Sequence, residues 1–491
     1  MTIPVTVIPR PAFVPSTTPC KNRRKKTLSA PVMVNLELTS GCNIKCRHCY
    51  NYWREDADNT DDAVSSQTLR AFVDRFMEAG VFHVVLTGGE PLLNFNTLLQ
   101  GLDMLHSAGI STSVNSNLMP VTPRRLARLK KHGLDHILTS LNSHDPSTND
   151  YMVNRNGAFR KIVRGISQAI DSGIRVSVNM IISEPNQNHV YETAKLCAQL
   201  GVQKLFATRL VPSVRVADPA ATDLTLQGDN VRRALDAMLQ AKNDFGIAIG
   251  TLISYPLCAL GDLQRYQDFV GRGCPAQSGN RMSVNADGTA HACTHEETGY
   301  GNILQEGIRA VFTRMRAWHN GSYLYPGCQG CDYIDICGSG CRMAAQAYQQ
   351  GINGKDPLFR GFTQITRDYV LEVPAALIDG IESGERFRVP PRVRFRKEDG
   401  FYSINVRWAN AFTIAGELAE FLIHKQASQQ AFHEGDLPGD HGKRALLFLA
   451  FKDAVEAENR QLQARLSERH KLGCSINPFE CSDAVTIQCT T

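Results

Sequence analysis

Short apolar segments alternate with amphipathic segments along residues 32–215, and this alternation predicts a sheet flanked by helices. The apolar segments are rich in β-branched and aliphatic residues, as strands are. They are Val32–Leu38, Phe82–Leu86, Ile110–Asn115, Asp135–Leu141, Ile174–Ile182 and Lys204–Leu210. Between them, apolar residues recur every three or four positions, as Leu69, Phe72 and Phe76 do, which indicates helices.

A glycine precedes most of these predicted strands, at Gly80, Gly109, Gly133, Gly173 and Gly201. A helix often ends at such a residue because glycine tolerates a positive φ. Strands that alternate with helices favour a parallel sheet with right-handed crossovers. An open sheet and a partial barrel both fit this pattern, and in either the chemistry belongs at the C-terminal ends of the strands.

The pattern changes several times outside this region. A Pro- and Thr-rich arm with a basic run precedes it, and a helical connector, a Cys- and Gly-rich region of weak periodicity, a further module and a Cys-containing tail follow. Their expected bounds are 1–31, 216–270, 271–360, 361–470 and 471–491. In the module, Arg392–Arg396 and Phe401–Val406 alternate like the strands of a hairpin, and helical patterns follow at 414–425 and 443–466. We expect a small α+β or winged-helix-like module there.

Composition restricts the class of protein. Hydrophobic residues make up 43% and charged residues 21%, and the net charge of +5 implies no nucleic-acid partner. No apolar stretch reaches the roughly 18–20 residues that span a bilayer, and the N-terminus lacks the pattern of a secretory signal, so we expect a cytoplasmic protein without membrane contact. Fifteen cysteines are many for a compartment where disulfides are rare, and they point to metal binding or catalysis.

Three of these cysteines, Cys42, Cys46 and Cys49, follow the first predicted strand. Three thiolates on one loop can hold three irons of a cubane cluster and leave the fourth iron open to a small chelating ligand. A structural zinc site normally has four protein ligands. His48 is the alternative fourth ligand, within the same tight loop.

The Cys-x3-Cys-x2-Cys spacing after the first strand resembles that of the radical S-adenosylmethionine (SAM) superfamily. The resemblance implies a partial (β/α)6 barrel of TIM type and a 4Fe–4S cluster whose open iron chelates SAM. One-electron reduction would then cleave SAM to methionine and a 5′-deoxyadenosyl radical that abstracts a hydrogen atom from the substrate. Cys42, Cys46 and Cys49 would be both the metal ligands and the catalytic centre.

A second motif, Gly88-Gly89-Glu90, ends the second predicted strand. By resemblance it contacts the amino group of SAM, since glycines permit close approach and a carboxylate pairs with an ammonium. Polar residues at the following strand ends are further expected SAM contacts, with loop capping as the alternative role for each. They are Asn115, Asn117, Ser140, Asn142 and Asn179, of which Ser140 fits the resemblance best, and Arg155 is the nearest arginine, at a different offset from that of relatives.

The Cys-rich region contains Cys328-x2-Cys331-x5-Cys337-x3-Cys341, which by itself would fit a zinc ribbon. With Cys274 and Gly288-x4-Cys293 upstream, it resembles the SPASM extension of peptide-modifying radical SAM enzymes. The resemblance implies one or two auxiliary Fe–S clusters. Their expected ligands are Cys274, Cys293 and Cys341 for the first cluster, and Cys328, Cys331 and Cys337 for the second.

The chain departs from the SPASM pattern at two ligand positions. Phe359 stands where relatives often have the last cysteine, and Asn280 where some have another. Either cluster could have an open iron, be absent, or use a ligand such as Asp332 or Asp335. Cys474, Cys481 and Cys489 of the tail are a less favoured source, and Cys197 and Cys258 are expected to be structural.

A third departure concerns a general base. Thr294 replaces the Asp that sulfatase-maturating relatives use as a base, for which His291, His295 or Glu296 could substitute.

These features predict a radical SAM oxidoreductase that crosslinks a ribosomally synthesised precursor peptide and takes electrons from a flavodoxin- or ferredoxin-type donor. Arg392, Arg394 and Arg396 would be available to an acidic peptide, or else form a solvated strand edge. The alternatives are a SPASM enzyme acting on a small molecule or folded protein, and a non-catalytic zinc or electron-transfer protein.

Overall fold

The structure is a computed structural model. It describes residues 27–51, 63–213, 224–226, 229–270, 273–348, 350–367, 370–374, 380–381, 383–407, 410–439, 442–468 and 486–490. The expected N-terminal arm, apart from its last residues, and Cys474 and Cys481 of the tail lie outside these ranges.

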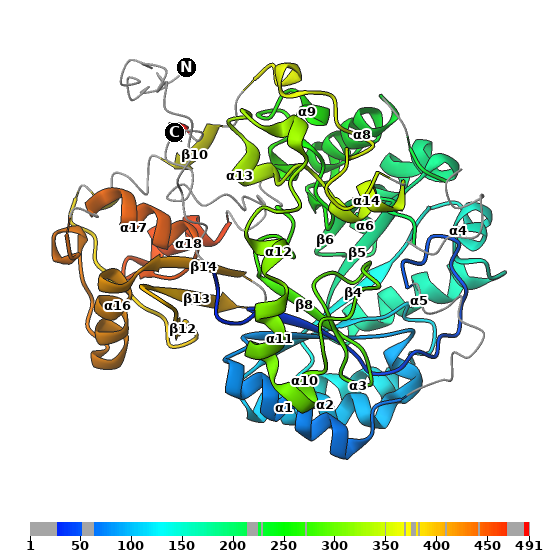
Figure 1. Cartoon of the computed structure of the whole chain (residues 1–491), viewed down its shortest axis with the longest axis horizontal. Helices are drawn as coiled ribbons and strands as arrows, with labels where there is room; N and C mark the ends of the chain where they lie inside the picture. The colour runs from blue at the N-terminus through cyan, green and yellow to red at the C-terminus, as the bar shows by residue number, and fades with distance from the viewer. Residues whose placement is uncertain are drawn as a thin grey trace.

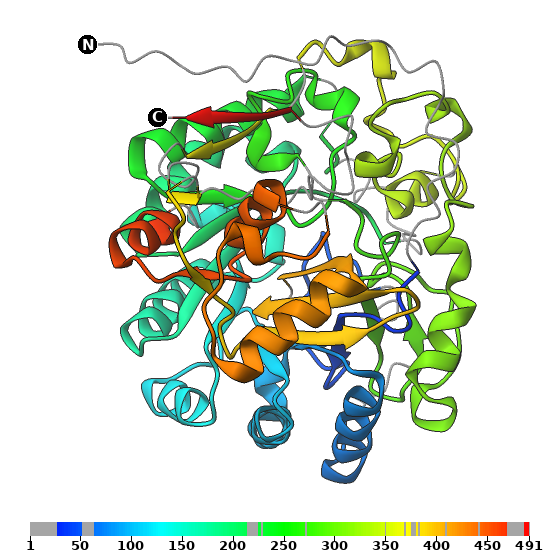
Figure 2. The same cartoon turned by 90° about the vertical axis from the view of Figure 1, so that its left-hand side faces the viewer.

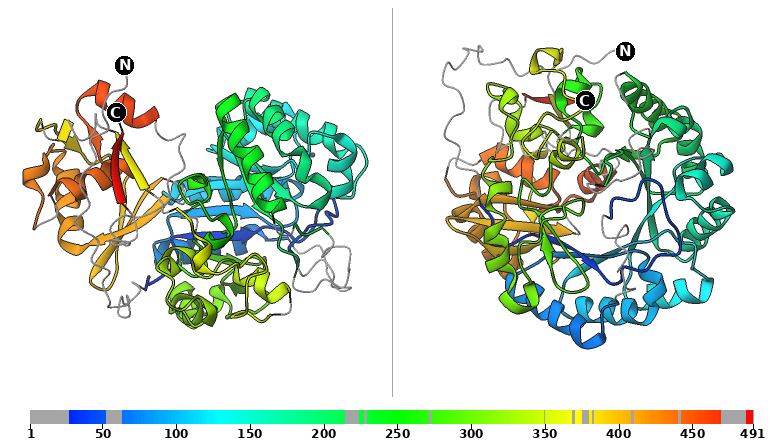
Figure 3. Two further views of the ribbon diagram at one scale, coloured as in Figure 1. Left: turned by 90° about the horizontal axis from the view of Figure 1, so that it is seen from above. Right: turned by 45° about the vertical axis from the view of Figure 1, so that its right-hand side comes forward.

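A nine-stranded sheet forms the centre of the molecule, in the order β7-β6-β5-β4-β3-β2-β1-β8-β9. The six predicted strands are all present to within one residue and are parallel. They are β1 (Met33–Glu37), β2 (His83–Thr87), β3 (Ser111–Asn115), β4 (His136–Ser140), β5 (Arg175–Ile182) and β6 (Lys204–Arg209). The sheet curves, with helices along its outer side (Figures 1 and 3). The expected α/β fold with a partial TIM-type barrel is confirmed.

The helices between these strands form where the sequence predicts them. They are α1 (Ser66–Ala79), α2 (Phe95–Ser107), α3 (Pro123–Lys131), α4 (Pro146–Val153), α5 (Ala158–Asp171) and α6 (Val190–Gln199), with 3-10 turns η2 (Pro91–Asn94) and η3 (Glu184–His189). Ser65 caps α1 by accepting a hydrogen bond from the Thr68 amide. The five glycines noted before the strands have φ between 68° and 85°, as expected for residues that end helices.

The two faces of the sheet differ in polarity because side chains alternate along a strand. Leu86 faces the helices, since a Cβ on Gly101 of α2 would lie 3.5 Å from its Cδ1 atom. Leu36 lies beside Leu86 in register and shares this face. The opposite, concave face therefore takes the alternate residues of these strands, among them Asn35 and Thr87. The inside of the barrel is polar near the C-terminal ends of the strands.

The Cys-rich region joins this sheet rather than standing apart. Strand β8 (Arg281–Val284) is parallel to β1, and β9 (Ala290–His291) is antiparallel to β8. The helices of this region are α10 (Ile303–Glu306), α11 (Ile308–Arg314), α12 (Arg316–His319), α13 (Ile334–Cys337) and α14 (Arg342–Ala347), with the 3-10 turns η5 (Pro326–Cys328) and η6 (Phe362–Gln364). Arg75 of α1 donates to the carbonyl of Leu304, which holds α10 against the barrel.

The connector is helical over α8 (Asn230–Phe245), α9 (Leu257–Leu260) and the 3-10 turn η4 (Gln267–Phe269). It also contains β7 (Ala248–Gly250), a three-residue strand that pairs with β6. So short a strand carries no periodic signal, which is why the sequence did not predict it.

The C-terminal module has the expected hairpin, β12 (Arg394–Lys397) and β13 (Phe401–Arg407), extended by β14 (Asn410–Ala415). Helix α16 (Gly416–Ser428) packs on this sheet (Figure 2, orange). The single helix expected over 443–466 is wrong. The chain forms α17 (Gly442–Phe451), β15 (Glu456–Ala457) and α18 (Arg460–Glu468), because Asp453 takes a left-handed φ of 58°. The remaining elements are β10 (Val370–Pro374), β11 (Phe387–Arg388), the 3-10 turn η7 (Glu434–Asp436) and β16 (Thr486–Thr490).

Arginines of β12 join the module to the N-terminal ends of the barrel strands. Arg396 donates to the carbonyls of Ala30 and Pro31, at 2.6 and 2.9 Å, just before β1. Arg394 donates to the carbonyl of Phe82 before β2, at 2.5 Å, and to that of Gly109 before β3. The expectation that these two arginines face a peptide or solvent is therefore wrong. Arg392 instead pairs with Glu456 on the surface.

Candidate active site

The loop that carries Cys42, Cys46 and Cys49 lies at the C-terminal end of β1, and its three thiols are partly buried. The end of β2 holds this loop from one side. The amide of Gly89 donates to the carbonyl of Thr39, and the amide of Glu90 to that of Gly41, both at 2.8 Å. A Cβ on Gly89 would lie 2.1 Å from the carbonyl oxygen of Gly41. The glycines of the Gly-Gly-Glu motif thus permit close approach to the cysteine loop itself.

Glu90 is fully buried and connects three strand ends. Its Oε1 accepts from the Ser116 hydroxyl at 2.7 Å and from the Leu92 amide at 3.0 Å. Its Oε2 accepts from the Asn117 amide at 2.7 Å. Burial raises the pKa of Glu90 to about 7, against the opposing effect of these donors. The carboxylate fixes the loop after β3, and its contact with SAM remains a prediction.

Asn117 continues this network to the cysteines. Its side-chain amide donates to Asn43 Oδ1 at 2.6 Å, and Asn43 directly follows Cys42. Arg155, which the sequence offers as a candidate SAM contact, donates to the carbonyl of Asn43. The main-chain amide of Arg47 donates to the carbonyl of Met152 at the end of α4, at 3.0 Å. The cysteine loop is thus held by β2, the loop after β3, and α4.

Ser140 and Asn179 lie side by side at the ends of β4 and β5. Both belong to the polar face of the sheet, and Asn179 Oδ1 accepts from the Thr208 hydroxyl at 2.5 Å. Asn142, in contrast, is fully buried and its Oδ1 accepts from the Ile181 amide at 3.1 Å. Asn142 therefore has the loop-capping role, while Ser140 and Asn179 remain predicted SAM contacts, as does Asn115 at the end of β3.

The Cys-rich region contains two groups of cysteines. The first group is Cys274, Cys293 and Cys341. Burial, with smaller contributions from the neighbouring Cys274 and Cys341, raises the pKa of the Cys293 thiol to about 12. The amide of Cys341 donates to Asp356 Oδ2 at 2.8 Å, and Arg209 at the end of β6 pairs with the same oxygen at 2.9 Å. This buried ion pair, which the sequence did not reveal, ties the first group to the C-terminal side of the barrel.

In the second group, Cys328, Cys331 and Cys337 line one cavity, together with Cys258. Burial raises the pKa of Cys337 to about 12, so the thiol is protonated until a metal ion replaces its proton. Among the described residues, no three Cys, His, Asp or Glu side chains converge so as to bind a single ion. A cubane cluster takes one thiolate on each iron, so spaced thiols at both groups fit an Fe–S cluster.

Comparison with known proteins identifies the barrel. Residues 36–197 match the model of the radical SAM superfamily. This segment is a radical SAM domain. Cys42, Cys46 and Cys49, the Gly-Gly-Glu motif and the polar strand ends all fall within it. The family uses a 4Fe–4S cluster together with SAM, which are the two main cofactors that the sequence predicts.

The relatives extend well beyond the radical SAM domain. PqqA peptide cyclase from Ruegeria pomeroyi is 25% identical over 352 residues, 68% of this chain and 88% of that protein. AdoMet-dependent heme synthase from Nitratidesulfovibrio vulgaris is 22% identical, over 66% of this chain and 91% of that protein. In structure, Streptococcus suis SuiB, solved with its precursor peptide SuiA, shares the fold with a TM-score of 0.52 and 15% identity, covering 67% of this chain and 75% of that one.

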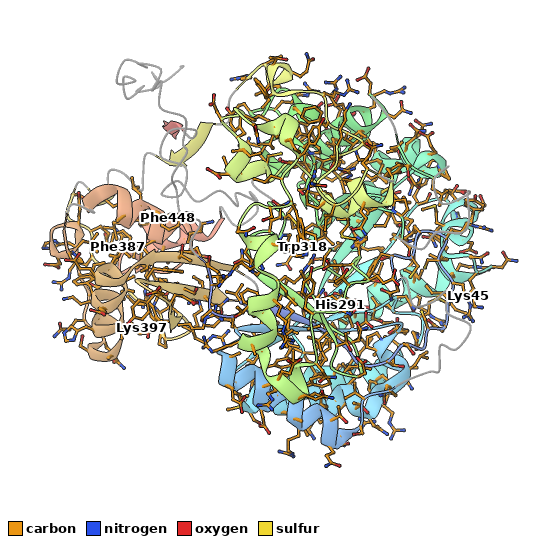
Figure 4. All side chains as sticks on the ribbon, in the orientation of Figure 1. Lys45, His291, Trp318, Phe387, Lys397 and Phe448 are labelled. Carbon is orange, nitrogen blue, oxygen red and sulfur yellow. The ribbon has the colours of Figure 1, made fainter. Side chains whose placement is uncertain are left out.

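The candidate bases near Thr294 occupy different surroundings. Glu296 is buried and accepts from Trp318 Nε1 at 3.1 Å and from the Tyr300 hydroxyl at 2.9 Å, within the Cys-rich region. His291, which Figure 4 labels near the centre of the molecule, is hydrogen-bonded to the carbonyl of Thr298. His295 makes a ring contact with Tyr50, which follows Cys49 in the radical SAM domain.

None of the described helices is long and apolar enough to cross a membrane.

Proposed function

We propose that this chain is a radical SAM enzyme that cleaves SAM reductively and crosslinks a ribosomally synthesised precursor peptide. The radical SAM domain supports the first part, and a peptide cyclase among the relatives supports the second. The cluster and SAM would supply a 5′-deoxyadenosyl radical. Cys42, Cys46 and Cys49 would hold the cluster, and the polar face with Ser140 and Asn179 would hold SAM.

The observation that carries this proposal is the contact between the two cysteine regions. Tyr50 follows Cys49, and its ring lies 4.7 Å from the ring of His295, two residues after Cys293. A peptide crosslink removes one hydrogen atom by abstraction, and then a proton and an electron as the new bond forms. An auxiliary cluster beside the radical centre would accept that electron. The Tyr50–His295 contact places the two cysteine regions next to each other, as such a step requires.

The C-terminal module is the proposed holder of the peptide leader. Its hairpin contacts the N-terminal ends of β1–β3, whereas the cysteine loop lies at the other end of β1. Figure 4 labels Lys45 of that loop and Phe387 of the module on opposite sides of the molecule. A five-residue strand such as β1 spans about 17 Å. A leader on the module must therefore be separated from the modified residue by at least about five extended residues.

We also propose a flavodoxin- or ferredoxin-type electron donor and a cytoplasmic location, where the many thiols of this chain stay reduced. A second candidate function is the modification of a small molecule, which the heme synthase relative favours.

Anaerobic reconstitution with iron and sulfide, followed by a 5′-deoxyadenosine assay with SAM and dithionite, tests the enzymatic part. We expect product from the wild-type chain and none from Cys46→Ala. A colourless, zinc-loaded protein that releases no 5′-deoxyadenosine would refute the proposal and favour the non-catalytic alternative.

A further inference from the structure

Four cysteines surround one cavity in the Cys-rich region. Cys258 of α9 lines it together with Cys328, Cys331 and Cys337, and its space, which is partly open to solvent, amounts to about 340 Å³. Its remaining lining is mostly apolar, and among the described residues that line it there is no carboxylate or imidazole. The aspartates considered as ligands from the sequence, Asp332 and Asp335, are exposed instead. Thiols are therefore the metal-binding groups that this cavity presents.

Polar groups lie beside the sulfurs of these four cysteines. The amide of Arg360 lies 3.3 Å from Cys258 Sγ and donates to it. At the other three sulfurs, neighbouring groups lower the pKa of the thiol against the effect of burial: the Ser339 hydroxyl at Cys328, the Tyr333 amide at Cys331, and the amides of Leu257 and Gly340 at Cys337. Donors to sulfur stabilise thiolate ligands and tune the potential of an Fe–S cluster. A cysteine that only fills space in a core has no need of such a donor.

The position of Cys258 follows from the segment that packs on α9. The amide of Leu263 donates to the carbonyl of Arg367 at 2.9 Å, and that of Thr366 to Gly261 at 3.0 Å. This segment begins near Phe359, where the SPASM pattern has its last cysteine, and Phe359 lines the same cavity. The thiol missing at position 359 is thus matched by one on the facing segment.

We propose that Cys258 is the fourth ligand of an Fe–S cluster held by Cys328, Cys331 and Cys337. This inference rests on the SPASM-type cluster of the proposed function and adds the ligand that the motif lacks. Four thiolates leave no iron open, so this cluster would carry electrons and not bind the peptide. Any open iron would belong to the group of Cys274, Cys293 and Cys341.

The test compares Cys258→Ala with Cys197→Ala in the reconstituted full-length chain. Cys197 is a buried cysteine of α6, and burial alone raises the pKa of its thiol, so it is a matched control without a metal role. Iron and sulfide per chain and the electron paramagnetic resonance spectrum are measured. Wild type with three 4Fe–4S clusters has about 12 irons. We expect Cys258→Ala to lose between one and four of them, with a three-iron signal when one is lost, and Cys197→Ala to lose none.

A second substitution distinguishes lost ligation from a damaged fold. In the double variant Cys258→Ala with Phe359→Cys, the new thiol enters the same cavity, and we expect the iron content and the four-iron spectrum to return. Cys258→Ser, which keeps the size of the side chain, should shift the reduction potential of one cluster, while Cys197→Ser should not. Wild-type iron, sulfide and potential in both Cys258 variants would overturn the assignment.

The outcome is independent of the proposed function. Dithionite-dependent 5′-deoxyadenosine formation reports on the loop of Cys42, Cys46 and Cys49, whereas the iron and sulfide content reports on ligation by Cys258. If no peptide is modified but Cys258→Ala still loses iron, the proposed substrate fails and the ligand assignment stands.

Discussion

Arg396 donates through Nε to the carboxylate of Glu398 at 2.7 Å, and both side chains are buried where the C-terminal module meets the barrel. Its Nη1 donates to the carbonyls of Pro31 and Gly80 and its Nη2 to that of Ala30, just before β1 and β2. Glu398 in turn accepts from the amide of Ser29 at 2.7 Å. This pair therefore ties the first described residues, the barrel and the module together.

Replacing Arg396 should destabilise the fold markedly. Arg396→Met leaves the Glu398 charge buried without its partner, and breaking such a pair costs about 3–5 kcal/mol. Arg388→Met is the matched control, because Arg388 and Glu458 form an exposed pair in the same module, worth less than about 1 kcal/mol. Urea denaturation measures both. An equal loss of free energy of unfolding in Arg396→Met and Arg388→Met would contradict the stabilising role of the buried Arg396–Glu398 pair.

Glu90→Gln should weaken SAM binding. An amide keeps only one acceptor oxygen, so either the Asn117 amide at Oε2 or the Leu92 amide at Oε1 loses its partner, at about 1–3 kcal/mol. The loosened Asn117 then holds Asn43 and the cysteine loop less well. We expect the dissociation constant of SAM, measured by equilibrium dialysis on reconstituted protein, to rise about tenfold, or ~1.4 kcal/mol. Glu78→Gln on the exposed side of α1 should leave the dissociation constant of SAM unchanged. An unchanged dissociation constant in Glu90→Gln would refute the role of Glu90 in SAM binding.

The Tyr50–His295 contact should affect the coupling of SAM cleavage to product formation. Tyr50→Leu removes the ring that joins the two cysteine regions, whereas Tyr50→Phe keeps it. We expect Tyr50→Leu to release severalfold more 5′-deoxyadenosine per modified peptide than wild type, and Tyr50→Phe to behave like wild type. Loss of coupling in both variants would point to the hydroxyl group rather than to the ring contact.

His83 makes the barrel sensitive to acid. It lies between the hydroxyls of Ser111 and Ser113, at 2.9 and 3.0 Å. Burial, with help from His136 and Arg394, lowers the pKa of His83 to about 3. The unfolded chain binds this proton near pH 6.5 and the folded chain does not, so stability present above pH 6.5 is lost as pH falls toward 3.

The measurement is the urea midpoint between pH 7 and 4. His83→Gln removes the titrating group, and we expect a shallower decline with pH than in wild type. Part of the decline should remain, because burial also lowers the pKa of His136 to about 4. An identical pH dependence in the variant would show that His83 does not contribute.

The parts of this fold that depend on local pattern could be predicted, and those that depend on distant contacts could not. The six central strands follow from runs of apolar residues, and Gly80 marks a helix end through its own φ. Strand β8 has only four residues and forms because β1 offers a free edge. From the sequence, Arg396 is expected at the surface, and only the fold shows that the carbonyls of Ala30 and Gly80 bind it in the interior.

The cysteines show the same division. The spacing of Cys42, Cys46 and Cys49 could be recognised in the sequence because all three lie on one loop directly after a strand. Cys258 gave no signal, since its partners are far away in sequence and only the packing of α9 on the segment after Phe359 brings them together. Sequence spacing finds ligands that share a loop and misses a ligand supplied by another segment.

The most direct test of the central claim is mass spectrometry of a candidate precursor peptide co-expressed with this chain. We predict that the peptide loses the mass of two hydrogen atoms per crosslink, and that it keeps its full mass when Cys42, Cys46 and Cys49 are replaced by alanine. A peptide of unchanged mass beside a wild-type chain that forms 5′-deoxyadenosine would contradict the claim and direct the search to a small-molecule substrate.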